Sequence, residues 1–490
     1  MTAYQRLQAR FRRWQALGDA EAMLHWDSAT MMPAGGAGAR KTQIATLRLL
    51  RHELLTDPAA ADDLAAATTD TDWDRANLRE MGRRWHHATA LPADLVEAMA
   101  HATADCEMAW RTARAADDFA GVAPLLADVV RLTRESAAAK AEALDLAPYD
   151  ALLDTYEGGL VAATVAPVFD ELAGFLPEFL DAAVERQAAA AALPGPFPIV
   201  KQQALARRLM LAAGFDFAHG RLDESHHPFT GGVPDDVRIT TRYDEDSCLE
   251  ALLAVLHETG HALYSRHLPA DWRDQPVGSS MGMAVHESQS LIVEMQAART
   301  DAYLGYLAGA LREAFGAEGT AWSVGNVAAL ARRVERGLIR VDADEISYPL
   351  HILLRFRLEQ ALLAGDLDVG DLSGAWREGM RDLVGIAPDD DKDGCLQDIH
   401  WYSGAFGYFP TYTLGAIGAA QLFETVAAEV DLDPSLAQGD LRPLTAWLAE
   451  KIHGRGRLFA TAEELLTDVT GRGFDVGCFR RHLERRYGVG

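Results

Sequence analysis

Two histidines four residues apart, His257 and His261, constrain this chain more than any other feature of its sequence. On a helix, side chains four residues apart lie on the same face, so both imidazoles can bind one zinc ion. Glu258 stands between them and can accept a proton from a water molecule at that ion. The pattern is typical of metallopeptidase sites, which keep one coordination position open for water.

The residues around the pair predict that it lies on a helix. Apolar residues before it recur at helical spacing, at Leu249, Leu252, Leu253 and Leu256. Ser247 followed three residues later by Glu250 predicts a capping box at the helix start, and Pro269 predicts the helix end. The alternative is a helix whose histidines only fill a core, but a buried glutamate beside them would be costly without a compensating charge.

A third protein ligand has to come from another part of the chain. Glu287 follows His261 by 26 residues, at the start of a second helical pattern, so a loop and a returning helix can bring it beside the first. We predict Glu287 as the third ligand, with Glu294 on the same helix face as the rival candidate. His286 is a candidate for orienting a ligand or binding an oxyanion, and a structural hydrogen bond is the alternative.

The rest of the chain predicts one large, mainly helical protein. Helical periodicity predicts long helices, for example at 92–116, 121–144, 164–192 and 436–452. No Ser/Gly linker or charge block divides the 490 residues, so we expect a single domain over residues 1–490. A rigid proline-rich break predicts that any division into lobes falls near 194–200.

One segment before the paired histidines has the period of a strand. Between Val237 and Tyr243, apolar and polar residues alternate, which predicts a short β-ribbon beside the metal-binding helix. An edge strand there could bind an extended peptide by main-chain hydrogen bonds, with Arg238 and Thr240 facing the cleft. The alternative is a strand whose polar face is only solvated.

Composition argues against several classes of partner. The net charge of −26, from 72 acidic and 46 basic residues, argues against nucleic acid and anionic membranes. Four scattered cysteines without CxxC spacing fit a reducing compartment. The sequence contains no signal-peptide pattern and no apolar run of transmembrane length. We therefore expect a soluble, cytoplasmic protein.

Several further motifs resemble those of the Taq-type metallocarboxypeptidases, a family of HExxH zinc peptidases, from near the N-terminus to about residue 425. Besides His257 to His261, the matching segments are His227-Pro228-Phe229, Asp236 with Arg238 and Thr240, His286 to Gln289, Ile339 to Glu345, and Gly394 to Trp401. Six motifs in the family's order are far more specific than one.

The resemblance implies a mainly α, large helical zincin with a deep groove, similar in architecture to neurolysin-like enzymes, which typically forms a homodimer. It implies one zinc ion per chain on His257, His261 and Glu287, with Glu258 as the general base. It also implies release of single amino acids from the free C-terminus of peptides, with broad specificity. Cobalt or manganese could occupy such a site as well. Ser265 stands where an acidic residue is expected in relatives, which leaves the ligands untouched.

The tetrahedral oxyanion of peptide hydrolysis needs a hydrogen-bond donor besides the metal. The segment from residue 400 to residue 412 offers one imidazole and three phenols. By similarity to the related zincins we predict His400, Tyr408 and Tyr412 as catalytic residues. The alternative is that these aromatic side chains only pack a loop.

A carboxypeptidase also needs a cation for the substrate's free carboxylate, and the planar guanidinium of arginine binds both carboxylate oxygens. Arg340 and Arg238 are the leading candidates, and Arg355 is the third. Each could instead pair with an acidic residue of the chain. His227 and His286 complete the predicted substrate-binding residues.

Two other functions remain open on the sequence alone. The same zinc site could serve an endopeptidase or oligopeptidase, which would not depend on a free C-terminus. A non-enzymatic peptide-binding protein with a structural metal is the other alternative. Glu258 argues against it, because structural sites usually close all four positions with protein ligands and need no base.

Overall fold

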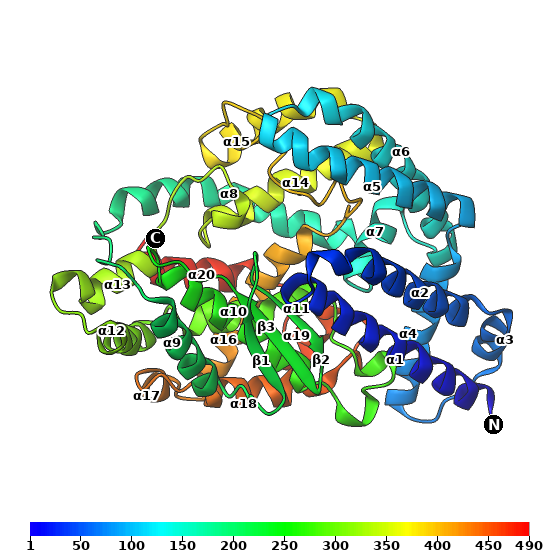
Figure 1. Ribbon diagram of the computed structural model, residues 1–490, viewed down its shortest axis with the longest axis horizontal. Helices are drawn as coiled ribbons and strands as arrows, with labels where there is room; N and C mark the ends of the chain where they lie inside the picture. Colours follow the sequence, from blue (N-terminus) through cyan, green and yellow to red (C-terminus); the bar gives the residue numbers. More distant parts are fainter. Residues whose placement is uncertain (490) are drawn as a thin grey trace.

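A computed structural model describes residues 1–489, in which helices form nearly all of the regular structure (Figure 1). The chain begins with an arm of four helices, namely α1 (Ala3–Thr30), α2 (Ala37–Thr56), α3 (Pro58–Ala66) and α4 (Asp72–Thr89). The first helix opens with a capping box in which Thr2 and Gln5 each bind the other's backbone amide. The arm has a small core of its own, formed by Tyr4, Leu7, Phe11, Leu55 and Met81.

A second group of helices forms the upper part of the molecule in Figure 1. Its members are α5 (Ala93–Ala116), α6 (Phe119–Leu144), α7 (Pro148–Tyr156), α8 (Ala162–Arg186), α14 (Ser347–Ala364) and α15 (Leu372–Val384). On α6, Val122, Leu126 and Val129 recur at helical spacing and are fully buried. They belong to a large core shared with α8, α14 and α15.

The lower part of the molecule contains a second large core. The helices that build it are α9 (Ile199–Ala213), α10 (Leu249–Arg266), α11 (Met283–Leu291), α12 (Asp301–Phe315), α13 (Val324–Ala331), α17 (Asp433–Leu436), α18 (Arg442–Lys451) and α19 (Ala462–Thr470). The π-helix η4 (Ile292–Ala297) continues α11. Short 3₁₀ turns lie between the helices, at η1 (Ala34–Gly36), η2 (Ala270–Trp272), η3 (Pro276–Gly278), η5 (Thr320–Trp322), η6 (Arg340–Asp342), η7 (Val369–Asp371) and η8 (His453–Arg455).

Helix α16 (Pro410–Glu429) joins the two large cores. Leu414 and Ile417 pack into the upper core, whereas Leu422 and Val426 pack into the lower one. The C-terminal helix α20 (Val476–Tyr487) packs against α16. Along the chain, the first stretch of the upper core ends at Ala183 and the lower core begins at Phe197, close to the predicted lobe boundary, and the chain returns to the upper core at later residues such as Ile346. The single-domain assignment stays a prediction.

A three-stranded sheet lies beside α10 (Figure 1). Its strands are β1 (Gly220–Glu224), β2 (Phe229–Val233) and β3 (Asp236–Thr241), in the order β1-β3-β2. The predicted ribbon is therefore confirmed, but its strand β3 is central, parallel to β1 and antiparallel to β2. Because both edges of β3 are paired, it cannot add a peptide strand, and the fully buried Thr240 does not face a cleft.

The predicted helices agree with the structure except at some ends. The predicted helix at 164–192 ends at Arg186, and that at 436–452 is two helices separated by a turn in which Gly439 has a positive φ of 74°. The capping box predicted at Ser247 is wrong, because α10 begins at Leu249 and has Cys248 as its uncapped N-cap residue. The mainly α fold with a small sheet beside the metal-binding helix is confirmed.

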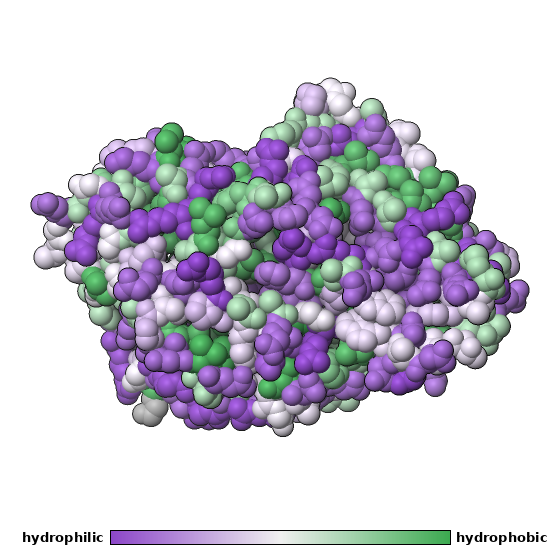
Figure 2. All heavy atoms as spheres, turned by 90° about the horizontal axis from the view of Figure 1, so that it is seen from below, coloured by the Kyte–Doolittle hydropathy of each residue, from purple (hydrophilic) through white to green (hydrophobic). Residues whose placement is uncertain are grey.

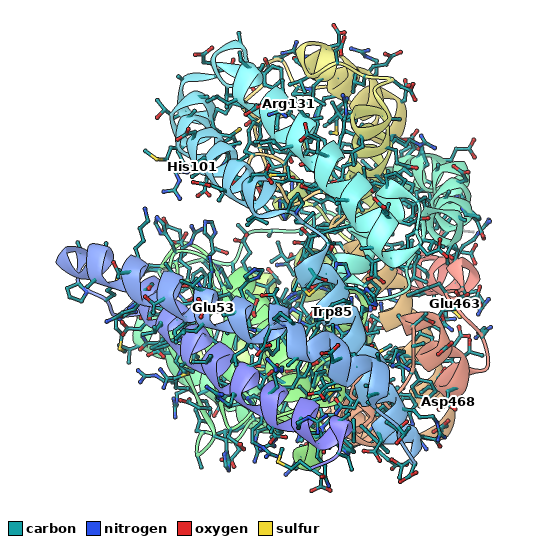
Figure 3. The ribbon with its side chains drawn as sticks, turned by 90° about the vertical axis from the view of Figure 1, so that its right-hand side faces the viewer. Glu53, Trp85, His101, Arg131, Glu463 and Asp468 are labelled. Atoms are coloured by element: carbon teal, nitrogen blue, oxygen red, sulfur yellow. The ribbon has the colours of Figure 1, made fainter. Side chains whose placement is uncertain are left out.

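The views from other sides show how the parts are arranged. In Figure 3, His101 on α5 and Glu53 on α2 lie on opposite sides of an open space between the upper helices and the arm, and Trp85 lies on α4. The space-filling view has a notched outline (Figure 2). Within residues 1–489, every helix is too short or too polar to cross a lipid bilayer.

Candidate metal centre and its surroundings

The paired histidines lie in the middle of α10, as the sequence predicts. The rings of His257 and His261 are 4.9 Å apart between centroids and nearly perpendicular, at 83°. The opposite face of the helix is anchored in the lower core by Leu252, Val255 and Leu256, which are fully buried. Packing of the apolar face in the core therefore fixes the helix, and both imidazoles project from its other face towards the candidate metal site.

Helix α11 returns beside α10 and brings Glu287 to the two rings. The ligand atoms of His257, His261 and Glu287 all lie within 4.8 Å of one another. Glu287 Oε2 is 3.5 Å from His261 Nε2. Two nitrogen donors and one carboxylate oxygen at this spacing suit a divalent transition metal with an open coordination position. The structure thus brings together the three ligands predicted from the sequence.

Two glycines permit this close approach. A Cβ on Gly260 of α10 would lie 2.3 Å from the main-chain oxygen of Gln289, so only glycine lets α10 and α11 meet here. A Cβ on Gly415 of α16 would lie 2.7 Å from the Cβ of Glu287. Helix α11 is therefore held between α10 and α16, with the Glu287 side chain resting on the second glycine.

The rival ligand, Glu294, approaches the far side of a histidine instead. Its Oε2 lies 3.5 Å from His257 Nδ1, and its Oε1 accepts a hydrogen bond from Arg299 Nη2. Contact with Nδ1 fixes the ring and leaves Nε2 of His257 for a metal. Glu294 lies on η4, and π-helical stretches of this kind are frequent at functional sites.

The carboxylates of the site remain ionised despite their burial. Burial favours the neutral acid, but the hydrogen bond from His261 and the nearby His257 lower the pKa of Glu287 to about 2. Burial opposes ionisation of Glu294 too, yet Arg299 and His257 hold its pKa below the usual range. Both side chains are therefore anionic at neutral pH.

The candidate general base Glu258 contacts the sheet. The hydroxyl of Thr230 on β2 donates to Glu258 Oε2 at 2.7 Å and also lies 2.9 Å from the Glu258 carbonyl oxygen. Glu258 is only 7% exposed. The hydroxyl thus restricts one carboxylate oxygen and leaves the other free of this contact. Thr230 was not predicted from the sequence, because only the folded sheet brings β2 to α10.

His286 packs on a predicted ligand. Its ring stacks on that of His261 at 4.5 Å and 28°. Burial and the neighbouring His261 lower the pKa of His286 to about 3, so the ring is neutral. This contact supports a role in orienting His261 more than a direct role in binding substrate.

The predicted oxyanion donors gather near Glu287. Between ring centroids, Tyr408 lies 4.9 Å from Tyr156 and 5.1 Å from Tyr412. The centroid of the His400 ring lies 5.7 Å from that of Tyr408. Burial is the largest cause of the raised pKa of Tyr408 and of Tyr412, and the negative charge of Glu287 raises both further. These phenols therefore remain protonated donors within the electric field of a predicted metal ligand.

Tyr348 joins this group and was missed by sequence reasoning. Its ring is 5.9 Å from that of Tyr412, and its pKa is raised by burial and by Glu287. The sequence feature that could have indicated it is the spacing of seven residues, or two helical turns, between Tyr348 and the predicted substrate-binding Arg355 on α14. His400 is neutral, because burial, with Arg340 and Arg355, lowers its pKa to about 4 against the opposing charge of Asp398.

Two of the predicted arginines share one buried carboxylate, Asp398. Arg340 donates to Asp398 through Nε and Nη2, and its Nη1 donates to the Tyr348 hydroxyl at 2.9 Å. Arg355 donates to Asp398 through Nε at 2.8 Å. Burial opposes ionisation of Asp398, but the two guanidiniums hold its pKa far below the usual range. Asp398 was not predicted, although it lies within the motif from Gly394 to Trp401.

The prediction that Arg355 binds substrate conflicts with its environment. Its side chain is fully buried, at 0% exposure. Besides Asp398, it donates to the His351 carbonyl and to Gln397 Oε1, each at 2.8 Å. Arg355 thus holds Asp398 in place. The guanidinium nitrogens of Arg340 are engaged as well, but the Arg340 side chain is 7% exposed, whereas no part of the Arg355 side chain can be reached by a substrate carboxylate.

The remaining predicted residues lie around the sheet. Arg238 pairs with Asp236 through two hydrogen bonds of 3.0 and 2.6 Å, and its guanidinium lies 4.5 Å from the ring centre of Trp26 on α1. It therefore fastens the arm to the sheet. The side chain of His227 is exposed, just before β2.

Comparison with known proteins assigns this geometry to a family. Residues 6–487 match the family described as "Carboxypeptidase Taq (M32) metallopeptidase". The chain belongs to this family. It is similar to thermostable carboxypeptidase 1 of Thermus thermophilus, at 39% identity over 99% of this chain and 98% of that one. It is also similar to carboxypeptidase 1 of Bacillus subtilis, at 30% identity over 97% and 96% of the two chains.

Solved structures give the same result. Metallocarboxypeptidase 1 of Trypanosoma cruzi is similar, with a TM-score of 0.97 and 40% identity over 99% of each chain. Pyrococcus furiosus carboxypeptidase is similar as well, with a TM-score of 0.94 and 31% identity over 99% of each chain. As a member of the M32 family, the protein is a metallocarboxypeptidase, a hydrolase that acts on peptides. The family implies a bound metal ion, and the donor set of His257, His261 and Glu287 fits one.

Proposed function

We propose that the protein is a zinc-dependent carboxypeptidase that releases single amino acids from the C-terminus of peptides with broad side-chain preference. The observation that carries the proposal is the group of His257, His261 and Glu287, whose ligand atoms lie within 4.8 Å of one another. Two imidazoles and one carboxylate suit one zinc ion per chain, and cobalt or manganese could replace it. Family membership supports the reaction class.

When bound, the metal supplies a Lewis acid for the scissile carbonyl and lowers the pKa of water. Glu258 accepts the proton of the attacking water, with Thr230 restricting its carboxylate through the 2.7 Å hydrogen bond. The protonated phenols of Tyr408 and Tyr412, with neutral His400, donate to the oxyanion as it forms. Glu258 then delivers the proton to the leaving amine.

For the substrate's terminal carboxylate we propose Arg340. Its pKa is raised by Tyr348 and Asp398 in spite of burial, so the guanidinium is permanently charged. The Cζ atom of Arg340 lies 5.3 Å from the centroid of the Tyr412 ring, which places the cation beside a proposed oxyanion donor. Arg238 remains the alternative, and the exposed His227 remains a proposed substrate contact. Both β1 and β2 are edge strands, and for the peptide main chain we propose β2, because its Thr230 contacts Glu258.

Timed digestion of matched peptides tests the proposal. A peptide with a free C-terminus should lose one residue at a time, and the same peptide with an amidated C-terminus should stay intact. Mass spectrometry of the products follows both. Release of internal fragments from the amidated peptide would overturn the exopeptidase assignment in favour of an oligopeptidase on the same site.

We also propose a homodimer in a reducing compartment such as the cytoplasm. The four cysteines, Cys106, Cys248, Cys395 and Cys478, are all buried free thiols, which suits a reducing environment. The family resemblance supports the dimer. Light scattering coupled to size-exclusion chromatography measures the mass, and a monomer at micromolar concentration would contradict the assignment.

A further inference from the structure

Helix α11, which carries Glu287, has no cap of its own. Its N-cap residue is Gly282, no side chain within the segment caps it, and its first turn contains no acidic residue. The first amides of a helix need acceptors, and an anion is favourable at this end. A distant residue supplies both, because Glu157 Oε2 accepts a hydrogen bond from the Ala284 amide at 2.7 Å.

Glu157 comes from a segment far from α11 in the sequence, at the end of α7. It directly follows α7, whose residues Leu152 and Leu153 pack into the upper core, and it is only 1% exposed. Burial raises its pKa to about 7, although the Ala284 amide and Arg457 act in the opposite direction. A carboxyl group is therefore kept at the start of α11 at a cost in desolvation.

The segment before α11 is built around this contact. A Cβ on Gly282 would lie 1.9 Å from Glu157 Oε1, so the carboxyl group rests directly on the glycine. Arg457 donates to the carbonyl oxygens of Ser280 and Met281 at 2.8 and 2.7 Å. The Met281 amide donates to the Tyr264 hydroxyl at 2.8 Å. Backbone groups of Ser280, Met281 and Ala284 are thus held by side chains from other elements.

This contact lies one turn from the proposed metal ligand. Ala284 and Glu287 are three residues apart and so lie on the same side of α11. The two histidines lie on α10, whereas the position of the Glu287 side chain depends on where α11 begins. The position of α11 along its own axis therefore decides whether the carboxylate reaches the imidazoles, and side chains that fix a ligand's position affect metal affinity.

We propose that Glu157 is a positioning residue for the metal centre, which caps α11 from the end of α7 and thereby sets Glu287 against His257 and His261. The inference rests on the proposed role of Glu287 as a ligand. It assigns to Glu157 control over metal affinity through its hydrogen-bond acceptor, with no contact to substrate.

Zinc affinity of the full-length protein tests this inference. Metal-free protein is titrated with zinc in competition with a chromogenic chelator, which gives a dissociation constant independent of activity. Glu157→Ala removes the acceptor and should weaken zinc binding about ten-fold, as loss of a residue supporting a ligand does. Glu157→Gln keeps an acceptor oxygen and should stay within about three-fold of the unchanged protein. At saturating zinc, KM should be unchanged in both variants.

Glu464→Ala is the matched control, because the exposed Glu464 also accepts a backbone amide, that of Ala460 at 2.8 Å, but at the start of α19, which carries none of the proposed ligands. Its zinc affinity should be unchanged. If Glu157→Ala fails to fold, Gly282→Ala displaces the same carboxyl group and should weaken zinc binding in its place. Zinc affinity within two-fold of the unchanged protein in the folded variant, or equal losses in Glu157→Ala and Glu464→Ala, would overturn the inference. A failure of the proposed function is distinguishable, since Glu287→Ala would then leave zinc affinity unchanged.

Discussion

The two sides of the site differ in the sign of their buried charge. On the metal side, within residues 1–489, the carboxylates of Glu258, Glu287 and Glu294 are accompanied by one guanidinium, that of Arg299, and the histidines are neutral when they bind metal. On the arginine side, made of Arg340, Arg355 and Asp398, two guanidiniums share one carboxylate. The first side lacks two positive charges and the second lacks one negative charge.

This difference indicates what each side binds. Uncompensated charge in a poorly solvated site is costly, so each side gains most from a partner that neutralises it. A divalent cation suits the metal side, and a single carboxylate such as the C-terminus of a peptide suits the arginine side. With the proposed ligands and Arg340 in these roles, the two sides would account for a metal requirement and for an exopeptidase preference, and substitutions that change one side should leave the other intact.

The largest expected effect concerns the metal side. Glu258→Gln removes the proposed base while leaving all three ligands, so kcat should fall about 1000-fold with an unchanged zinc content. His261→Ala should lose both zinc and activity. Elemental analysis alongside steady-state kinetics separates the two variants. Substantial activity in zinc-loaded Glu258→Gln would show that the base is another residue.

On the arginine side, Arg340 and Arg355 should respond differently to the same substitution. Arg340→Met should lower kcat/KM for free-acid peptides about 100-fold, because it removes the proposed partner of the substrate carboxylate. Arg355→Met should chiefly lower the free energy of unfolding, by about 3–5 kcal/mol, since it breaks an ion pair whose arginine is fully buried and whose aspartate is 11% exposed. Peptide kinetics and urea unfolding measure the two quantities. Equal kinetic losses in both variants would remove the distinction between binding and supporting arginines.

A smaller effect is expected at Arg299, whose guanidinium pairs with Glu294 on the metal side. Arg299→Met leaves Glu294 without its partner, so the carboxylate holds His257 less firmly and zinc affinity should fall about ten-fold. Chelator competition measures the change, and the exposed Arg208, which pairs with Glu313 far from the ligands, provides a control as Arg208→Met. An unchanged zinc affinity would show that Glu294 does not need this partner.

The smallest effect concerns Glu359, a buried carboxyl group with only neutral partners. It accepts hydrogen bonds from Tyr149, Trp401 and the Gly407 amide, and burial nevertheless raises its pKa to about 7. A raised pKa means that the folded state binds the proton more tightly, so this contribution to stability is complete below the usual carboxyl pKa and is lost as pH rises through 7. The opposite direction holds for Asp398, whose partners are charged.

Urea unfolding between pH 5 and pH 8 measures this effect. Relative to the unchanged protein, Glu359→Gln should become more stable as the pH rises over this interval, with Glu464→Gln as the exposed control. Buried histidines such as His286 and His400, whose pKa values are lowered, act in the opposite direction in both proteins and cancel in this difference. A parallel pH dependence in Glu359→Gln and the unchanged protein would assign it to other groups, such as Glu157.

The sequence predicted the parts of the site that depend on local spacing. His257, Glu258 and His261 belong to one helix, and Glu287 begins the next helical segment, so periodicity and a single reversal of the chain sufficed. Thr230, Glu294 and Asp398 acquire their partners only through tertiary contacts. Thr230 contacts α10 from β2, Glu294 contacts α10 from η4, and Asp398 contacts α14 from the loop before α16. Periodicity carries no information on such contacts, and it likewise did not show that Arg355 is buried or that β3 is central.

The helix α16 has a consequence for inactivation by heat. It contributes side chains to both large cores, and its Gly415 rests against Glu287. Melting of either half would therefore disturb the same helix and displace the same carboxylate. Loss of zinc, loss of activity and loss of helical signal should then occur at one common temperature, with no partly melted form that still retains its ion.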